Sequence, residues 1–364
     1  MSNVYFFTGF PGYIATQLIK DLVKRENVHY IYLLTLPQLK KQAEEQMTSI
    51  ANAANFPNKH WKVIEGDITK ANLHLKNEVI NLLKNTVTHV FHLAAIYDLA
   101  VEKNIAYTVN VTGTKNVNQF VKNLERLKRY IYFSTAYVAG KREGKILETE
   151  LDMGQDFKNY YEETKFKAEV EVQKIINQVP TTIFRPGVVF CHSVTGETMK
   201  FDGLYFMLNF FDRMKHLPMI PYLGRGDVEG NFVPIDYIVS ATMFLSHEEI
   251  GVGKTYHLTD PKPYKMREIY KMMLKEYTGK TPIGTLPISL TKAFLSIPLI
   301  RKWLRVEKEA LDYFMINTQY DCSIVQEDLK HSGIQCPDLK DVIKNMIDYY
   351  RIHKEDPTKQ IKIR

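Results

Sequence analysis

Thr8-Gly9-Phe10-Pro11-Gly12-Tyr13-Ile14-Ala15 is the stretch of this chain that decides its fold. The apolar run Val4–Thr8 before it predicts a strand, and the spacing of leucine and isoleucine after it predicts a helix over Tyr13–Lys24. A glycine-rich turn between a strand and a helix is suited to holding the pyrophosphate of a dinucleotide, because the first N–H groups of the helix are unpaired. The stretch therefore predicts a dinucleotide-binding α/β unit.

The glycines of this turn have separate tasks. Gly9 and Gly12 stand where a side chain would block the tight turn and the approach of a phosphate. The expected third glycine is Ala15, which is still small enough for close packing of the helix on the strand. The residues expected to contact a cofactor here are Thr8, Gly9, Phe10, Pro11, Gly12, Tyr13 and Ile14.

Strand-like and helix-like segments alternate along the first half of the chain. Strands are predicted at Val4–Thr8, Tyr30–Leu34, Lys62–Glu65, Thr88–His92, Tyr130–Phe133, Thr181–Phe184 and Thr255–Leu258. Helices are predicted at Tyr13–Lys24, Leu39–Ala54, Val79–Leu83, Asn110–Leu124 and from Tyr161 to about Asn177. This alternation predicts an α/β fold, namely a Rossmann-type, doubly wound parallel sheet with helices on both faces.

The pattern changes after Arg185. Residues 191–230 are rich in Gly, Pro, Met and aromatics without a clear period, and the segments from 261 onward are mostly helical. We expect residues 1–190 plus 231–260 to form the NAD(P)-binding domain. We expect 191–230 plus 261–364 to form a smaller, mostly helical substrate-binding subdomain.

Composition narrows the functional classes. The 364 residues carry a net charge of +7, from 48 basic and 41 acidic side chains, and 45% of them are hydrophobic, as in a soluble globular protein. Basic residues form no stripe interleaved with aromatics, so no nucleic-acid partner is expected, and the positive charge suits an anionic cofactor. Cys191, Cys322 and Cys336 lack metal or redox spacing and the 11 histidines are dispersed, so no metal site is expected. With no signal pattern and no membrane-length apolar run, we expect a cytoplasmic protein.

Two further loops are placed to contact a cofactor. Asp67 and Ile68 follow the third predicted strand, where a carboxylate can accept a hydrogen bond from an adenine amino group. Ala94 and Ala95 follow the fourth, where small side chains let the backbone approach a ribose. For each of these residues, an ordinary loop or capping role is the alternative.

The end of the second strand bears on the choice between NAD and NADP. Leu33–Pro37 contains no acidic residue to bind a ribose diol and no arginine to bind a 2′-phosphate. Lys40 and Lys41 follow closely and are placed to meet a 2′-phosphate. NADP is therefore favoured over NAD, with Lys40 as its contact.

Tyr161 and Lys165 form a Tyr-x-x-x-Lys pair, which places both side chains on one face of a helix. A reductase needs a proton donor to the carbonyl oxygen as hydride reaches carbon, and a nearby ammonium stabilises the phenolate that results. Thr135, after the strand Tyr130–Phe133, supplies a hydroxyl that orients the carbonyl oxygen. We therefore expect Tyr161 as acid/base, Lys165 as the residue that adjusts the pKa of Tyr161, and Thr135 as orienting donor. The alternative for Tyr161 is an ordinary tyrosine of an amphipathic helix.

Asn110, expected at a helix start, is either a fourth catalytic residue or a helix cap.

Taken in order, these motifs resemble the extended short-chain dehydrogenase/reductase superfamily. The resemblance covers about the first half of the chain and adds Arg185, Pro186, Gly187 and Val188 to the expected cofactor contacts. It implies that the active-site hydroxyl belongs to Thr135 rather than to Ser134, and that Lys165 also reaches the nicotinamide ribose. Phe133–Val138 and Thr195–Gly203 further resemble the branch of fatty acyl-CoA reductases and carrier-protein thioester reductases, the "male sterility" type. That branch implies reduction of an acyl thioester by NADPH.

The chain departs from the family pattern at two positions that bear on cofactor choice: it lacks an arginine after the second strand, and Ala15 replaces the third glycine.

The substrate side leaves alternatives open. The apolar stretch Leu204–Tyr222 lines a lipid-sized pocket or forms subdomain core. Ile288–Leu304 combines large apolar residues with lysine and arginine, so it lies on a membrane surface, forms a homodimer contact or packs internally. The expected function is reduction of a lipophilic carbonyl or acyl thioester. An epimerase, dehydratase or hydroxysteroid-type dehydrogenase on the same scaffold is the alternative, and a non-catalytic NADP-binding redox sensor is the alternative of another class. A homodimer is expected by analogy alone.

Overall fold

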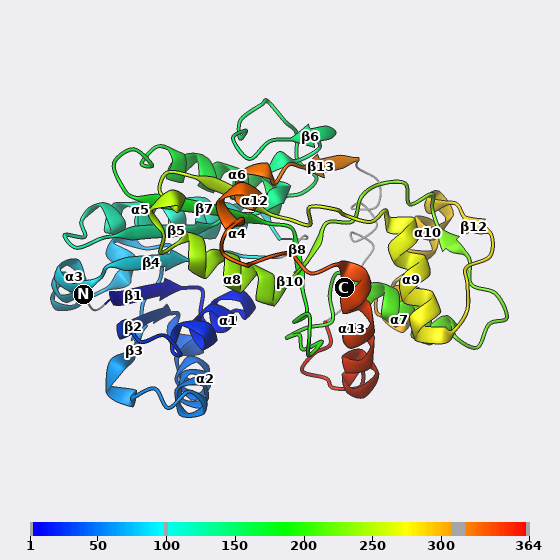
Figure 1. Ribbon diagram of the computed structural model, residues 1–364, viewed down its shortest axis with the longest axis horizontal. Helices are drawn as coiled ribbons and strands as arrows, with labels where there is room; N and C mark the ends of the chain where they lie inside the picture. The colour runs from blue at the N-terminus through cyan, green and yellow to red at the C-terminus, as the bar shows by residue number, and fades with distance from the viewer. Residues whose placement is uncertain (1–2, 98–100, 307–316, 362–364) are drawn as a thin grey trace.

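A seven-stranded, all-parallel sheet forms the centre of the computed structural model, which describes residues 3–97, 101–306 and 317–361 (Figure 1). The strand order is β11-β7-β5-β4-β1-β2-β3. These strands are β1 Asn3–Thr8, β2 Val28–Thr35, β3 Trp61–Glu65, β4 His89–His92, β5 Arg129–Phe133, β7 Thr181–Pro186 and β11 Thr255–Leu258. The predicted Rossmann-type sheet is confirmed.

Helices cover both faces of this sheet because alternate side chains of each strand point to opposite faces. Tyr5 and Phe7 of β1 pack with one helical layer, and Val4 and Phe6 pack with the other. The first layer is α1 Tyr13–Leu22, α2 Lys40–Ala53, α8 Ile235–Leu245 and α12 Ser323–Leu329. The second is α3 Asn77–Thr86, α5 Gly113–Lys122 and α6 Tyr160–Gln173. Both faces are therefore buried, as a parallel sheet requires.

A second hydrophobic core lies beyond the sheet, at the side of the molecule that holds α7, α9 and α13 (Figure 1). Its helices are α7 Tyr205–Met214, α9 Met266–Thr278 and α13 Leu339–His353, followed outward by α10 Ile288–Leu295 and α11 Pro298–Leu304. The remaining short strands are β6 Gly144–Ile146, β8 Val188–Phe190, β9 Tyr222–Leu223, β10 Phe232–Pro234, β12 Thr285–Leu286 and β13 Thr318–Tyr320. They pair as β8 with β10, β9 with β12 and β6 with β13.

The structure refines how we divide the chain. Cys322, Val325 and Leu329 pack in the core of the sheet although they belong to the segment assigned to the substrate side. We therefore propose the predicted division, with α12 moved to the NAD(P)-binding domain.

The apolar stretch from 204 to 222 contains α7, a helix that the sequence analysis did not predict. Tyr205, Leu208 and Phe211 are buried in the second core, while Phe206 and Phe210 pack under α10 and α11. The apolar face of α7 is therefore core of the subdomain, whereas Leu217 and Met219 after the helix are exposed.

Candidate active site

The glycine turn lies at the carboxyl edge of the sheet, where β1 is flanked by β4 on one side and β2 on the other. Ligands of open parallel sheets bind at such a reversal of strand order. Gly9 has a φ of +90°, and a Cβ there would lie 2.7 Å from the backbone N of Ala94. A Cβ on Gly12 would lie 2.6 Å from the carbonyl oxygen of Gly9. Only glycine at both positions lets this turn form against the loop after β4.

The N-terminus of α1 fits a dinucleotide pyrophosphate. Gly12 caps the helix without any side-chain hydrogen bond, and no acidic residue lies in its first turn. The unpaired N–H groups of that turn and the positive end of the helix dipole favour an anion. The side chains of Phe10 and Tyr13 are engaged elsewhere, since Phe10 is buried and the Tyr13 hydroxyl donates to the Glu197 carbonyl at 3.1 Å. Backbone groups are thus what this turn offers a cofactor.

Thr8 ties the ends of β1 and β4 together. Its hydroxyl accepts from the N–H of Ala94 at 3.2 Å and lies 2.7 Å from Nδ1 of His92, whose Nε2 lies 3.1 Å from the hydroxyl of Thr114. Burial, with the charge of Lys165 second, lowers the pKa of His92 to about 3, so the imidazole is neutral. Thr8 positions the loop of Ala94 and Ala95 through these bonds.

Asp67 follows β3 with one carboxylate oxygen engaged. Oδ1 accepts from the backbone N–H and from the hydroxyl of Thr69, at 2.9 and 2.8 Å. Oδ2 has no hydrogen bond with any residue that the structure describes. The next residue, Ile68, is buried, and its carbonyl accepts from the side chain of Asn116 at 2.7 Å. Asp67 therefore has the acceptor that an adenine amino group needs.

Lys40, the predicted 2′-phosphate contact, begins α2 and is exposed. Its ammonium donates to the Glu65 carboxylate at the end of β3 at 2.8 Å, and this bond with the Glu65 charge raises the pKa of Lys40. A phosphate in this place would compete with Glu65 for the ammonium. Glu65, at the end of β3, therefore bears on whether Lys40 can bind the 2′-phosphate of NADP.

Tyr161 and Thr135 lie close together at the carboxyl end of β5. Thr135 follows β5 and Tyr161 lies in the first turn of α6. Burial raises the pKa of Tyr161 above its usual value, and a hydrogen bond with the Thr135 side chain opposes that shift. Both residues are buried, and the ring of Tyr97 packs edge-on against the ring of Tyr161 with centroids 5.2 Å apart. The phenol is thus held in its protonated form beside a hydroxyl, as a proton donor must be.

Lys165 is buried one helical turn after Tyr161. Its ammonium donates to the Phe133 carbonyl at 2.7 Å and to the Tyr132 hydroxyl at 3.2 Å, and it lies 4.7 Å from the centre of the Tyr132 ring. Burial lowers the pKa of Lys165 to about 8, while the charge of Glu169 opposes this. The ammonium is therefore anchored to the strand that leads into Thr135.

Asn110 is not at a helix start, which corrects the sequence-based placement. The chain is continuously helical from α4, Lys103–Ala106, through a turn of π-helix, η4 Tyr107–Thr112, into α5. The Asn110 side chain accepts from the N–H of Ile96 at 2.9 Å and donates to the Thr164 hydroxyl at 3.0 Å. It joins the loop after β4 to α6, between Tyr161 and Lys165. The capping alternative is thereby excluded, since the π-turn places this side chain between the loop after β4 and α6, and a catalytic role for Asn110 stays a prediction.

Arg185 is the centre of a buried network that sequence reasoning missed. Its guanidinium donates to both carboxylate oxygens of Glu169, with Nη2 to Oε1 at 2.6 Å, and Nη1 lies 3.2 Å from Nε2 of His257. Glu169 also accepts from the hydroxyl of Ser134. The side chain of Arg185, expected at the cofactor, is thus engaged inside the protein. Glu169 sits four residues after Lys165, so the sequence places both on one helix face, but that spacing does not identify Arg185 as the partner of Glu169.

Glu148 extends this network to α12. Its carboxylate accepts from the backbone N–H groups of His257, Ile324 and Val325, while its carbonyl accepts from Arg185. Burial raises the pKa of Glu148 to about 7, and the three N–H donors oppose the shift. Since arginine can only donate, Nε2 of His257 accepts, and its Nδ1–H donates to the Asp321 carbonyl at 2.7 Å.

Pro186 ends β7, Gly187 follows it, and Val188 begins β8. The N–H groups of Gly187 and Val188 donate to the carbonyls of Leu258 and Asn231. A Cβ on Gly187 would lie 2.7 Å from Oδ1 of Asn231. These bonds fix the path of the segment, and its cofactor contact stays a prediction.

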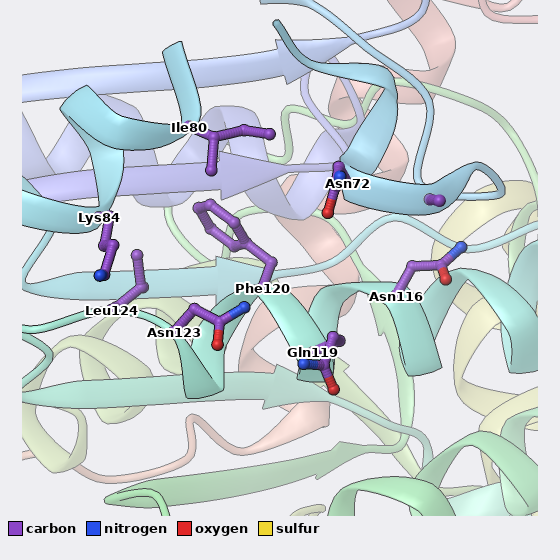
Figure 2. A pocket seen from close by; sticks show the side chains of 9 residues that line it. Asn72, Ile80, Lys84, Asn116, Gln119, Phe120, Asn123 and Leu124 are labelled. Atoms are coloured by element: carbon purple, nitrogen blue, oxygen red, sulfur yellow. The ribbon is translucent and has the colours of Figure 1, made fainter. Parts of the chain in front are cut away.

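A separate concavity lies between α3 and α5 (Figure 2). Figure 2 shows Ile80 and Lys84 facing Phe120 and Asn123 across it. Lys84 is paired with Glu125 at 3.0 Å. None of the predicted site residues lines this concavity. The concavity is therefore not part of the candidate active site.

Comparisons with known proteins agree with this geometry. The family described as male sterility protein, an NAD-binding family, matches residues 7–242. The chain belongs to this family. It therefore carries an NAD(P)-binding reductase domain of the extended short-chain dehydrogenase/reductase type.

Individual relatives are more distant. The chain is 26% identical to the nonribosomal peptide synthetase cpsA of Aspergillus campestris, over 78% of this chain and 28% of that protein. It is 25% identical to the fatty acyl-CoA reductase wat of Drosophila melanogaster, over 65% of this chain and 53% of that protein. The chain thus spans from about a quarter to about half of these relatives. Its fold is similar to the terminal R domain of the myxalamid biosynthetic pathway, with a TM-score of 0.83, 22% identity and coverage of 98% and 92% of the two chains.

Removing the charge of Glu169 tests the buried network. Glu169→Gln leaves the Arg185 guanidinium buried without its counter-ion, so we expect the free energy of unfolding to fall by about 3–5 kcal/mol. The matched control Glu163→Gln removes the partially exposed pair with Lys167 from the same helix and should cost about 1 kcal/mol or less. Urea denaturation of both variants measures the difference. Equal losses would mean that the Arg185–Glu169 pair does not hold α6 on the sheet.

Proposed function

We propose that the chain reduces a fatty acyl thioester or a similar lipophilic carbonyl, using NADPH as reductant and Tyr161 as acid/base. The observation that carries the proposal is the buried phenol of Tyr161, close to the buried side chain of Thr135 that follows β5. The membership of the male sterility family and the similarity to a fatty acyl-CoA reductase support the thioester as substrate class.

The side chains divide the work as follows. Thr135 holds the carbonyl oxygen, and the protonated phenol of Tyr161 gives that oxygen its proton. The ammonium of Lys165 stabilises the phenolate that remains. Bound NADPH supplies the hydride. The resulting hemithioacetal returns its hydroxyl proton to the phenolate as the C–S bond breaks, and the thiolate takes a proton from solvent, which leaves an aldehyde and a free thiol. Reduction of that aldehyde to an alcohol at the same residues would need the hydride of a second NADPH.

Backbone groups of the turn from Gly9 to Gly12 would hold the pyrophosphate, and Asp67 would accept from the adenine amino group. Lys40 would meet the 2′-phosphate by leaving Glu65. An acidic residue to bind a ribose diol is absent from the end of β2, where Leu34 and Thr35 stand. This donor set favours NADPH over NADH.

A substrate panel with Tyr161→Phe tests the reaction. We expect acyl-CoA thioesters to oxidise NADPH with the unmodified protein, and Tyr161→Phe to lower kcat by about 10²–10⁴-fold, because the proton donor is lost. Tyr160→Phe is the matched control, since this exposed neighbour precedes Tyr161 on the same helix. Nicotinamide absorbance gives the rates, and product analysis separates aldehyde from alcohol.

Other results would assign the site differently. Turnover of aldehydes or ketones without thioesters would make the chain a carbonyl reductase. Cofactor binding without turnover of any of these substrates would support an epimerase, a dehydratase or a redox sensor. Equal activity of Tyr161→Phe and Tyr160→Phe would remove Tyr161 from the chemistry.

The pH dependence of reduction follows from Lys165. Because its pKa is lowered to about 8, the ammonium is lost as the pH rises through that value. We expect kcat for reduction to fall above about pH 8, where the phenolate of Tyr161 loses its stabilising charge. In Lys165→Arg, a group that keeps its proton, the fall should move to higher pH. A profile that keeps its inflection in Lys165→Arg would assign the titration to another group.

Cofactor preference is tested at Lys40. Lys40→Ala removes the side-chain contact that we propose for the 2′-phosphate, so we expect the KM for NADPH to rise about tenfold while that for NADH is unchanged. The matched control Lys41→Ala removes the adjacent, more exposed lysine and should leave both values unchanged. A similar rise for both cofactors in Lys40→Ala would rule out recognition of the phosphate.

A further inference from the structure

Helices α10 and α11 contact each other and pack one face of each onto α7. Leu295 and Leu304 are buried there, and Ile300 packs with them against Phe206 and Phe210. These contacts form a small hydrophobic core between α7 and the inward face of the two helices. The large apolar residues on their other face are exposed to solvent over about half of their surface or more.

The outward face is nevertheless apolar. Leu290 and Phe294 of α10 are 44% and 47% exposed, and Leu299 and Trp303 of α11 are 80% and 52% exposed. Ile297, in the turn between the helices, is 46% exposed. Residues four apart are neighbours on a helix, so Leu290 lies next to Phe294 on α10, and Leu299 lies next to Trp303 on α11. These five residues are called the α10–α11 patch, and α10 lies at the outer end of the substrate side in Figure 1.

The segment of sequence that carries the patch is basic. Residues 277–306 contain no aspartate or glutamate, and their basic residues are Lys280, Lys292, Arg301, Lys302 and Arg305. Lys280 donates to the carbonyls of Lys215 and Leu217 and forms no ion pair with a residue that the structure describes. Arg305 faces the exposed Glu355 at 3.7 Å. The patch is thus a set of apolar and aromatic side chains within a positively charged segment.

We propose that the α10–α11 patch docks the protein on an anionic lipid bilayer, with the two helices lying in the plane of the interface. Tryptophan, phenylalanine and leucine enter the boundary between headgroups and acyl chains, and the lysines and arginines meet anionic headgroups. In the described parts of the chain, no helix is long and apolar enough to cross a membrane, so the contact is peripheral. This surface contact is independent of the reaction proposed above.

A second copy of the chain is the competing occupant. A two-fold contact through this face would bring the basic segment of one copy against the same basic segment of the other. Juxtaposed like charges oppose association. An anionic bilayer accepts the apolar side chains and also attracts the basic ones. The positive charge therefore favours a bilayer over a second copy of the chain.

Trp303 reports on its own environment. The chain has two tryptophans, so Trp61→Phe leaves Trp303 as the only one. We expect its emission to shift to the blue with vesicles of phosphatidylcholine and phosphatidylserine, and much less with phosphatidylcholine alone. Added salt should weaken the shift, because exposed charges are screened. Co-sedimentation of the unmodified protein with the same vesicles gives a second measurement.

Variants identify the patch as the contact. Leu299→Ser with Trp303→Ser should lower the partition coefficient by about tenfold or more, because the inserted side chains are lost. Lys302→Glu should lower it for phosphatidylserine vesicles. The matched control Ile352→Ser changes a side chain that is 77% exposed on α13 and should bind as the unmodified protein does. All the substituted positions are exposed, and circular dichroism verifies that each variant is folded.

Two outcomes would overturn the proposal. One is the absence of binding to phosphatidylserine vesicles at low salt by the folded, unmodified protein. The other is a dimer in light scattering that the Leu299→Ser, Trp303→Ser variant dissociates while vesicle binding is unchanged, which would assign the patch to a second copy.

Discussion

The ion pair between Glu169 of α6 and Arg185 of β7 fixes the helix that carries the candidate catalytic residues. Tyr161, Lys165 and Glu169 follow one another at four-residue intervals, so they share one face of α6. Their partners are Thr135, the Phe133 carbonyl and Arg185, which all lie on or beside neighbouring strands β5 and β7. A buried ion pair tolerates burial only when its geometry and remaining hydrogen bonds are complete. Here the hydroxyl of Ser134, the Glu148 carbonyl and His257 complete them.

The same constraint reaches segments that are distant in the sequence. Glu148 binds the N–H groups at the start of α12 and of His257 on β11, so one buried carboxylate joins three separate parts of the chain. On the other side of the site, the hydroxyl of Tyr13 joins the cofactor turn to the loop of Glu197. The Tyr13 contact thus binds the substrate side to the cofactor turn, while the Glu148 contacts join α12 and β11 within the NAD(P)-binding domain.

The fold was largely predictable because its signals are local. Period-two and apolar runs marked all seven strands, and the glycines of the turn from Gly9 to Gly12 marked the switch point of the sheet. The pairing of Arg185 with Glu169 was not predictable, because it joins a strand to a helix through a geometry that no local pattern encodes. Asn110 was misplaced for a related reason: its partners, Ile96 and Thr164, become neighbours only once α6 packs on the π-turn.

Burial acts on the two titrating groups of the site in opposite directions. It raises the pKa of Tyr161, which keeps the phenol protonated, and it lowers the pKa of Lys165 to about 8, which weakens the charge beside it. The charge of Glu169, one turn further along α6, opposes the loss of that ammonium. Glu169 thus connects the fold to the chemistry: the carboxylate that anchors α6 through Arg185 also favours the protonated lysine. A neutral residue at 169 could fill the space but would supply neither effect.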